Sequence, residues 1–310
     1  MSMNRQHRST RGPSRHPGLI IGGGVLLLLL LAALAYSHLG PMGRQNERIR
    51  REIQGLEHLA RIRTVIEPLQ VCRGLMTMHA AGRRPSPPFQ ELTQQQAMVE
   101  AAFADLMTYQ YNQHDPLGLA AETEALHREW QQFGRERHEA TAEELFEIFT
   151  PYIGRLLALH RRVVTASGLD LDPVAGTYNL TQILDQMLEL VMEPTGQIRA
   201  LYAGFLADPA SGERMQERVM GRAIPLDNIS ARIEHHADLA IDARPELGPL
   251  LGELPATLRA STRQIRTLLQ IYPLGAAVDP SDAQHFFAGA TEVITAGYRL
   301  YDIALVSCQS

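Results

Sequence analysis

The 310-residue chain contains no lysine, so all 29 of its basic residues are arginines. Without a lysine amine the protein has no Schiff-base nucleophile, no P-loop lysine and no kinase lysine. Cysteine is scarce as well: the chain has Cys72 and Cys308 alone, which excludes a disulfide framework and any C-x-x-C metal or redox motif. The patterns G-x-S-x-G and H-E-x-x-H are also absent. These absences predict a protein that is not an enzyme and that holds no cofactor or metal ion.

An excess of positive charge is missing too, since the formal net charge is −5. Proteins that bind nucleic acid gain much of their affinity by neutralising phosphates with basic side chains, so we expect no nucleic-acid partner. Apolar residues make up 45% of the chain and charged residues 20%, a composition that can bury a core and is not that of a disordered chain. The length fits two domains or one long repeated domain.

Signals for β-strands are lacking as well. We find no sustained alternation of apolar and polar residues and no Asn-Gly or Asp-Gly turn. Apolar residues recur instead at spacings of three and four, which indicates helices. Pro, Gly and Asp clusters separate the helical segments. The expected helices cover residues 44–82, 89–113, 118–139, 141–167, 177–207, 212–243, 246–272 and 281–306.

Eight helices joined by short loops are typical of an antiparallel helical bundle. The loop at residues 168–176 (GLDLDPVAG) falls near the middle and divides four helices from four. We therefore predict an all-α, membrane-anchored bundle built from two similar four-helix halves, residues 44–167 and residues 177–306.

The membrane anchor is expected at the N-terminus. Residues 1–18 contain four arginines and no acidic residue, and Leu19–Ala35 carries no charge. As a helix this run measures about 25 Å, close to the thickness of a hydrocarbon core. We predict a transmembrane signal-anchor over residues 19–36 and a cytoplasmic basic tail over residues 1–18. A cleaved signal peptide is the alternative, because Ala33-Leu34-Ala35 fits an A-x-A site.

The long basic segment and the length of the apolar run favour the anchor over the signal peptide. Either interpretation places residues 40–310 outside the cytoplasm. With the anchor retained, the chain is expected to be a single-pass protein of the inner membrane whose bulk is periplasmic.

One pattern occurs twice in the chain. V-x-E-P-x-x-x-x-R-x-L is found at residues 65–75 and again at residues 191–201, with a constant offset of 126 residues. Proline inside a helix removes a backbone donor and bends the helix. We therefore predict one structural unit used twice, a long helix bent at Glu-Pro with an arginine two turns further on.

Those two arginines, Arg73 and Arg199, are the candidate ligand-binding residues. Each lies on the shoulder of an apolar helical stripe, where an arginine can lay its stem on apolar surface and turn its guanidinium toward a groove. The planar fork suits planar anions such as carboxylate and nitrate. In the alternative interpretation each arginine pairs with an acidic residue on a neighbouring helix. Glu67 and Glu193 are expected to cap or pair near the bends rather than to contact a ligand.

Two short segments resemble a known family. Residues 69–76 (LQVCRGLM) are similar to the Q-x-x-R-G segment of bacterial extracytoplasmic sensor modules, and residues 167–180 resemble their S-x-L-x-x-D-P…Y-x-L segment. These modules occur in chemoreceptors, sensor kinases and diguanylate cyclases, and include the nitrate/nitrite-sensing and helical bimodular types. The resemblance covers about residues 44–306. Cys72 departs from it, because the nitrate/nitrite-sensing type tends to have Glu there.

The resemblance implies an extracytoplasmic ligand-sensing module of a chemoreceptor-like signalling system, with a small anion as the favoured ligand. We expect signalling through a homodimer or a partner signalling protein, in addition to contact with the membrane. The alternative is a structural or assembly membrane protein whose grooves hold a partner's helix; solvent-facing apolar residues at Phe286, Val293 and Tyr301 would favour it. A fragment of a longer receptor with two spans is a third interpretation.

Overall fold

The computed structural model of the chain describes residues 17–80, 89–133, 140–207, 212–271 and 280–309. Every regular element within these ranges is a helix, which confirms the predicted all-α class. For residues 17–42 the description covers the backbone alone. Most of the predicted basic tail and the side chains of the predicted span therefore lie outside the described residues. Within the described part of the chain, no helix combines the length and the apolar character that a membrane span requires.

The chain divides into two compact units, residues 1–49 and residues 50–310. Helix α1 covers Pro17–Ala80, so its residues from Arg50 onward belong to the second unit. The remaining helices of the second unit are α2 (Phe89–Asn112), α3 (Ala120–Phe133), α4 (Ala142–Ser167), α5 (Ala175–Gln186), α6 (Glu193–Ala207), α7 (Gly212–Ala223), α8 (Leu226–Ala243), α9 (Gly248–Leu251), α10 (Leu254–Ile271) and α11 (Pro280–Cys308).

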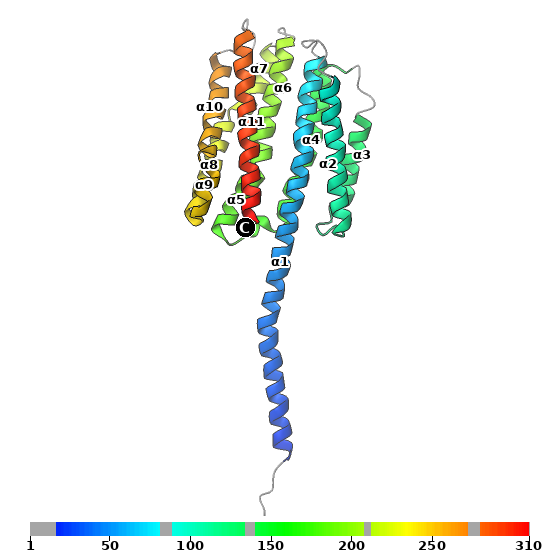
Figure 1. The fold of residues 1–310 in the computed structure, drawn as a ribbon, viewed down its shortest axis with the longest axis vertical. Helices are drawn as coiled ribbons and strands as arrows, with labels where there is room; N and C mark the ends of the chain where they lie inside the picture. Colours follow the sequence, from blue (N-terminus) through cyan, green and yellow to red (C-terminus); the bar gives the residue numbers. More distant parts are fainter. Residues whose placement is uncertain (1–16, 81–88, 134–139, 208–211, 272–279, 310) are drawn as a thin grey trace, which may run out of the picture. The chain divides into compact units, whose positions relative to one another are not determined.

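Helices of the second unit run side by side and form a bundle (Figure 1). Among the described elements, α5 contacts α8 and α11, and α10 contacts the same two helices, so these four close into a ring. Helix α3 lies between α2 and α4. Helix α6 contacts α4, α7 and α11, and thereby connects the two groups of helices. This position brings the second copy of the repeated pattern to the middle of the bundle.

Helix α4 shows how the sequence sets a helix and its buried face. Thr141 and Glu144 form a capping box at its start, and Gly168 ends it in a left-handed conformation with φ of 79°. Leu145, Phe149 and Tyr152 follow one another at spacings of four and three, and all three are buried. Burial of one such stripe on each helix provides the apolar core of the bundle.

Two of the expected helices are each divided in the structure, and the expected break before residue 44 is absent, because α1 continues from Pro17 to Ala80. The segment expected to be a single helix over residues 212–243 consists of α7 and α8, which are separated by a turn at Ile224 and Pro225. Proline fixes its own φ and has no N–H, so it is suited to the turn and to the start of α8. The segment expected over residues 246–272 begins with a 3-10 turn and the short α9, and α10 starts only at Leu254. Gly252, with a positive φ of 52°, makes that second break.

The segment expected over residues 177–207 is helical throughout but changes type within its length. A π-helix at Met187–Met192 separates α5 from α6. Helix α5 begins at Ala175, two residues before the expected start, with Val174 as its cap. In the preceding loop the Asp172 carboxylate accepts a 2.8 Å hydrogen bond from the Val174 N–H.

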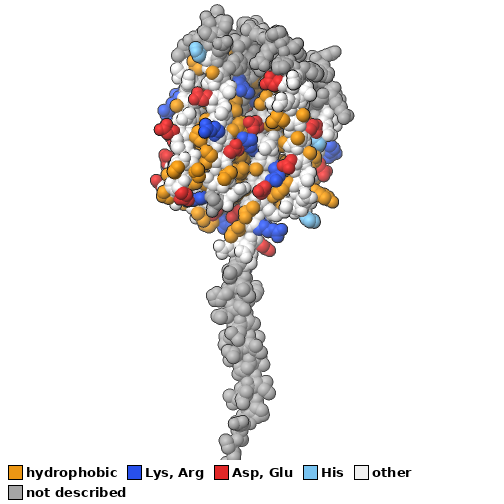
Figure 2. Space-filling view, viewed as in Figure 1, with side chains coloured by type: hydrophobic (Ala, Val, Ile, Leu, Met, Phe, Trp, Pro, Cys, Tyr) orange, Lys and Arg blue, Asp and Glu red, His pale blue; other side chains and the backbone are white. Residues whose placement is uncertain are grey.

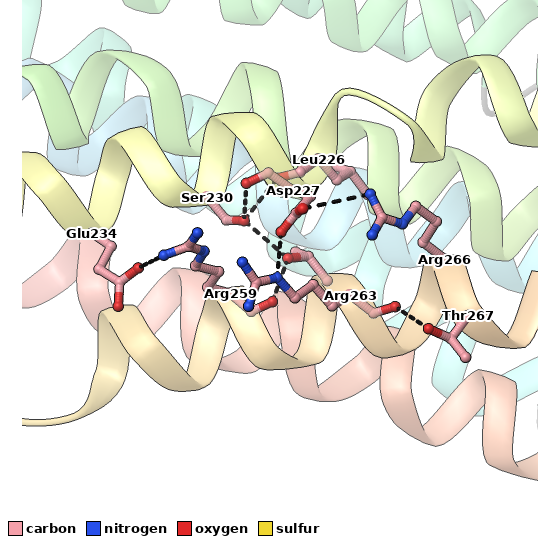
Figure 3. A network of polar contacts seen from close by, with 9 residues as sticks. Leu226, Asp227, Ser230, Glu234, Arg259, Arg263, Arg266 and Thr267 are labelled. Atoms are coloured by element: carbon pink, nitrogen blue, oxygen red, sulfur yellow. Dashed lines mark hydrogen bonds and ion pairs between the residues drawn. The ribbon is translucent and has the colours of Figure 1, made fainter.

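Polar contacts join α8 to α10 along one seam (Figure 3). Asp227 accepts a 2.7 Å hydrogen bond from the Arg263 side chain and lies 3.5 Å from Arg266. Two turns further along α8, Glu234 accepts a 2.6 Å hydrogen bond from Arg259. Partly exposed pairs of this kind each contribute little to stability, and here they link separate turns of the two helices. Acidic and basic side chains are likewise interspersed among apolar ones on the face of the second unit in Figure 2.

Candidate functional site

A buried polar cluster lies where α1, α6, α7 and α11 meet. We define this central polar cluster as Gln70 and Arg73 of α1, Glu193, Gln197 and Arg199 of α6, Arg222 of α7 and Tyr298 of α11. Arg73 is completely buried, with 0% of its surface exposed, and Glu193 is 4% exposed. Ionised groups are rarely buried to this degree unless they are paired. The partners within the cluster therefore determine what it can do.

Arg73 and Glu193 form a two-pronged ion pair across the bundle. Arg73 Nη1 donates to Glu193 Oε1 at 2.5 Å, and Arg73 Nη2 donates to Glu193 Oε2 at 3.2 Å. This fork-on-carboxylate geometry is the strongest arrangement available to arginine. For Arg73 the structure therefore shows the alternative interpretation, in which the arginine pairs with an acidic residue on a neighbouring helix. Both Nη groups are occupied by Glu193, while the buried Nε has no hydrogen-bond partner.

Two glutamines complete the hydrogen bonding of the Glu193 carboxylate. Gln70 Nε2 donates to Oε2 and Gln197 Nε2 donates to Oε1, each at 2.8 Å. The Tyr298 hydroxyl in turn donates to Gln70 Oε1 at 3.0 Å. Burial raises the pKa of Tyr298 well above its ordinary value, which keeps this hydroxyl protonated as a donor. With four donors around it, the Glu193 carboxylate is saturated.

Gly196 makes room for the ion pair. A Cβ atom at this position would lie 3.0 Å from Arg73 Nη2, closer than a side chain normally approaches. The glycine one turn after Glu193 therefore lets the Arg73 guanidinium lie directly on α6. At the matching position of the first copy the chain has Gln70, whose side chain reaches Glu193 instead.

Arg199 lies near Arg73 but has a different environment. Its Nη1 contacts Thr291 Oγ1 of α11 at 3.5 Å, and among the described residues no carboxylate forms an ion pair with it. Its Nη2 would lie 3.9 Å from a Cβ built on Gly74 of α1, so the guanidinium reaches between α1 and α11. Burial and the nearby Arg73 charge lower the pKa of Arg199. Both effects mean that this cation is stabilised less here than in water.

Arg222 adds a third guanidinium to the cluster. Its Nε donates to Gln197 Oε1 at 2.5 Å, and its Nη1 donates to the Arg218 carbonyl at 2.7 Å. Burial and the neighbouring Arg218 lower the pKa of Arg222 as well. The Phe146 ring of α4 lies 5.8 Å from the Arg222 guanidinium carbon and 5.9 Å from that of Arg73, distances that suit cation–π attraction.

The cluster therefore contains more positive than negative charge. Three guanidinium groups, those of Arg73, Arg199 and Arg222, are set against the one buried carboxylate of Glu193. A guanidinium without a carboxylate partner in a partly buried setting attracts an anion, because the low local dielectric strengthens the interaction. Chemically, the arrangement can accept one small anion at Arg199 without displacing the Arg73–Glu193 pair.

An open groove of about 600 Å³ runs along α11 beside this position. Thr291, the contact of Arg199, is one of its lining residues. The other lining residues are Leu254, Thr257, Ala288, Glu292, Thr295, Ala296 and Arg299. Solvent can therefore reach the side of Thr291 that faces away from the core.

The two copies of the repeated pattern have different surroundings. Glu193 pairs with Arg73 of the other copy, whereas Glu67 pairs with Arg63 one turn before it at 2.7 Å, and Arg63 also binds Asp302 at 2.8 Å. Both glutamates thus pair near the prolines, as expected. The backbones also differ, because α1 remains an α-helix through Pro68 while Pro194 follows the π-helix.

Several cluster residues were not anticipated from the sequence. Gln70 and Gln197 lie within the two copies of the repeated pattern but at positions that the pattern does not specify, and Arg222 and Tyr298 lie outside both copies. Gln70 lies in the quoted Q-x-x-R-G segment, which is the one signal that could have indicated it. Arg222 and Tyr298 gave no such signal, since their positions relative to α6 depend on tertiary packing.

Comparison of the chain with protein-family models, curated proteins and solved structures found no match.

Proposed function

We propose that the chain is a membrane-anchored, extracytoplasmic ligand-binding module of a signalling system that takes a small planar anion at Arg199. The observation that carries this proposal is the partly buried Arg199 guanidinium, which has no carboxylate ion-pair partner among the described residues and lies beside a second arginine. A bound carboxylate or nitrate would supply the missing negative charge. The proposed localisation is the inner membrane, with residues 19–36 as the span and the second unit in the periplasm.

The proposal gives the two arginines of the repeat different roles. Arg199 contacts the anion, and Arg73 holds α1 against α6 through Glu193. Arg73 also contributes positive potential, because its charge acts on Arg199. Signalling would then consist of small shifts of α6 and α11 relative to α1 when the anion binds, passed on to a second copy or a partner protein.

The competing function is a structural or assembly protein that holds a partner's helix. Solvent-facing apolar residues at Phe286, Val293 and Tyr301 would have favoured it. All three are buried in the structure, with exposures of 2%, 0% and 0%. The final helix therefore offers no apolar face at these positions, and the anion-binding module is the function we favour.

The test uses the full chain purified in detergent. Its thermal unfolding is recorded with nitrate, acetate and dicarboxylates, and the affinity of any stabilising anion is then measured by calorimetry. A charge-assisted hydrogen bond is worth about 1.5–3 kcal/mol, so Arg199→Ala should weaken binding about 10- to 100-fold. Arg199→Lys should weaken it less but measurably, because an ammonium cannot reproduce the fork.

The matched control is Arg263→Lys, at an exposed arginine paired with Asp227 on the α8–α10 seam. This control should leave anion affinity unchanged. The proposal fails if no anion raises the melting temperature, or if the Arg199 and Arg263 variants bind the anion equally well.

A further inference from the structure

The groove along α11 carries both signs of charge next to Arg199. Glu292 and Arg299 line it, and among the described residues neither forms an ion pair. Both are exposed side chains on the same face of α11 as Thr291 and Thr295. Elsewhere on the described surface acidic and basic side chains commonly pair across helices, as Asp227 does with Arg263. An acid that remains available beside a cationic site is therefore a feature that a ligand can use.

Its position on α11 places this acid next to Thr291, the residue that Arg199 contacts. Glu292 follows directly after Thr291, whose hydroxyl contacts Arg199 Nη1 at 3.5 Å. Neighbouring residues on a helix point in directions about 100° apart, and both side chains line the same groove. Arg199 does not itself line the groove, so Thr291 is the residue that links it to Glu292, and a ligand that contacts both groups has to extend across Thr291.

The remaining lining residues are small or uncharged. Thr257 and Thr295 offer hydroxyl groups, and Leu254, Ala288 and Ala296 offer short apolar surfaces. Threonine hydroxyls both donate and accept hydrogen bonds, so they can serve either end of a polar ligand. A volume of about 600 Å³ is at the scale of small-molecule sites and larger than a single nitrate or acetate requires.

We propose that the ligand of this groove is a small zwitterion of the amino-acid class, with its carboxylate on Arg199 and its ammonium on Glu292. This inference rests on the proposed anion contact at Arg199 and extends it to a second charged group of the ligand. A simple anion leaves Glu292 unused and is repelled by its charge. A zwitterion turns that repulsion into attraction, so the same glutamate selects amino acids over carboxylic acids of equal size.

Alanine and propionate provide the discriminating pair, because they differ in the ammonium group and match closely in size. Each is titrated into the full chain in detergent by calorimetry, at a pH where both carboxylates are ionised. The expected result is that alanine binds at least 10-fold more tightly than propionate. Larger amino acids are then compared with the corresponding acids to find which side chain the groove prefers.

Glu292→Gln tests the assigned role of the acid. This exposed substitution should reduce alanine affinity about 10-fold or more and leave propionate affinity equal or higher, so that the preference disappears. Glu246→Gln, at an exposed acid paired with Arg244, is the control and should leave the preference intact. Circular dichroism of each variant confirms that the helices remain.

The outcomes separate the two proposals. Equal binding of alanine and propionate, with both weakened by Arg199→Ala, overturns the zwitterion and leaves the anion site standing. A preference for alanine that persists in Glu292→Gln also overturns the assigned site. If neither compound binds, and nitrate and dicarboxylates also fail to bind, the anion site and the zwitterion are both wrong.

Discussion

The buried Arg73–Glu193 pair makes a quantitative prediction about stability. Glu193→Gln keeps the size of the side chain but removes its charge, so the completely buried Arg73 guanidinium loses its counter-ion. Breaking a buried pair by removing one partner costs about 3–5 kcal/mol, because the remaining charge has neither water nor a partner. The four donors now directed at the carboxylate make a neutral amide a poor replacement.

That cost translates into a large shift in thermal unfolding. For chains of more than about 150 residues, 1 kcal/mol lowers the melting temperature by about 2–4 °C. We therefore expect Glu193→Gln to lower it by about 6–20 °C in detergent. Glu147→Gln is the control, because it makes the same substitution in a pair with Arg218 where the glutamate side chain is 58% exposed. Exposed pairs contribute about 0–1 kcal/mol, so the control should shift by at most a few degrees.

A double substitution distinguishes a lost counter-ion from a general disturbance of packing. Arg73→Met with Glu193→Gln removes both members of the pair, so Arg73 no longer leaves a completely buried charge without its counter-ion, and stability should recover relative to Glu193→Gln alone. The reasoning is refuted if Glu193→Gln destabilises no more than Glu147→Gln. It is also refuted if removing Arg73 as well makes the protein less stable still.

Three further predictions follow from single features. Burial lowers the pKa of His160 to about 3, against about 6.5 in the unfolded chain. The contribution of neutral His160 to the free energy of unfolding is therefore complete above pH 6.5 and is lost as the pH falls toward 3, with a loss of about 2 kcal/mol at pH 5. Denaturant unfolding at pH 7 and pH 5 should show this loss in the wild type and not in His160→Gln. A Cβ at Gly55 would lie 2.4 Å from Ser167 Cβ, so Gly55→Ala should destabilise the protein by about 1–3 kcal/mol. The contrasting substitution is Gly154→Ala in α4, where no atom lies within 4 Å of the added Cβ. It should stabilise the protein by about 0.5–1 kcal/mol, and urea titrations measure both changes. For the proposed anchor, a periplasmic reporter fused after Ser310 should be active and should sediment with membranes; activity in the soluble periplasmic fraction would indicate cleavage instead.

The amino-acid sequence by itself determined the helical class and most helix ends. Apolar spacings of three and four are local, and so are the signals that stop a helix, such as the glycine at Gly168. The expected helix over residues 141–167 agrees with α4 to within one residue for this reason. Where the prediction was wrong, at Pro225 and Gly252, a local breaker was present but lay inside an otherwise regular pattern.

The repeated pattern identified Arg73, Glu193 and Arg199 as residues of interest, but only the tertiary structure decided their partners. The shared pattern gives each arginine the same spacing from Glu-Pro along its helix, while pairing depends on what the neighbouring helix presents. Arg73 meets Glu193 where Gly196 leaves room for its guanidinium on α6, and Arg199 meets Thr291 of α11 instead of an acid. These contacts join residues more than 90 positions apart, and no local rule of helix formation reaches that far.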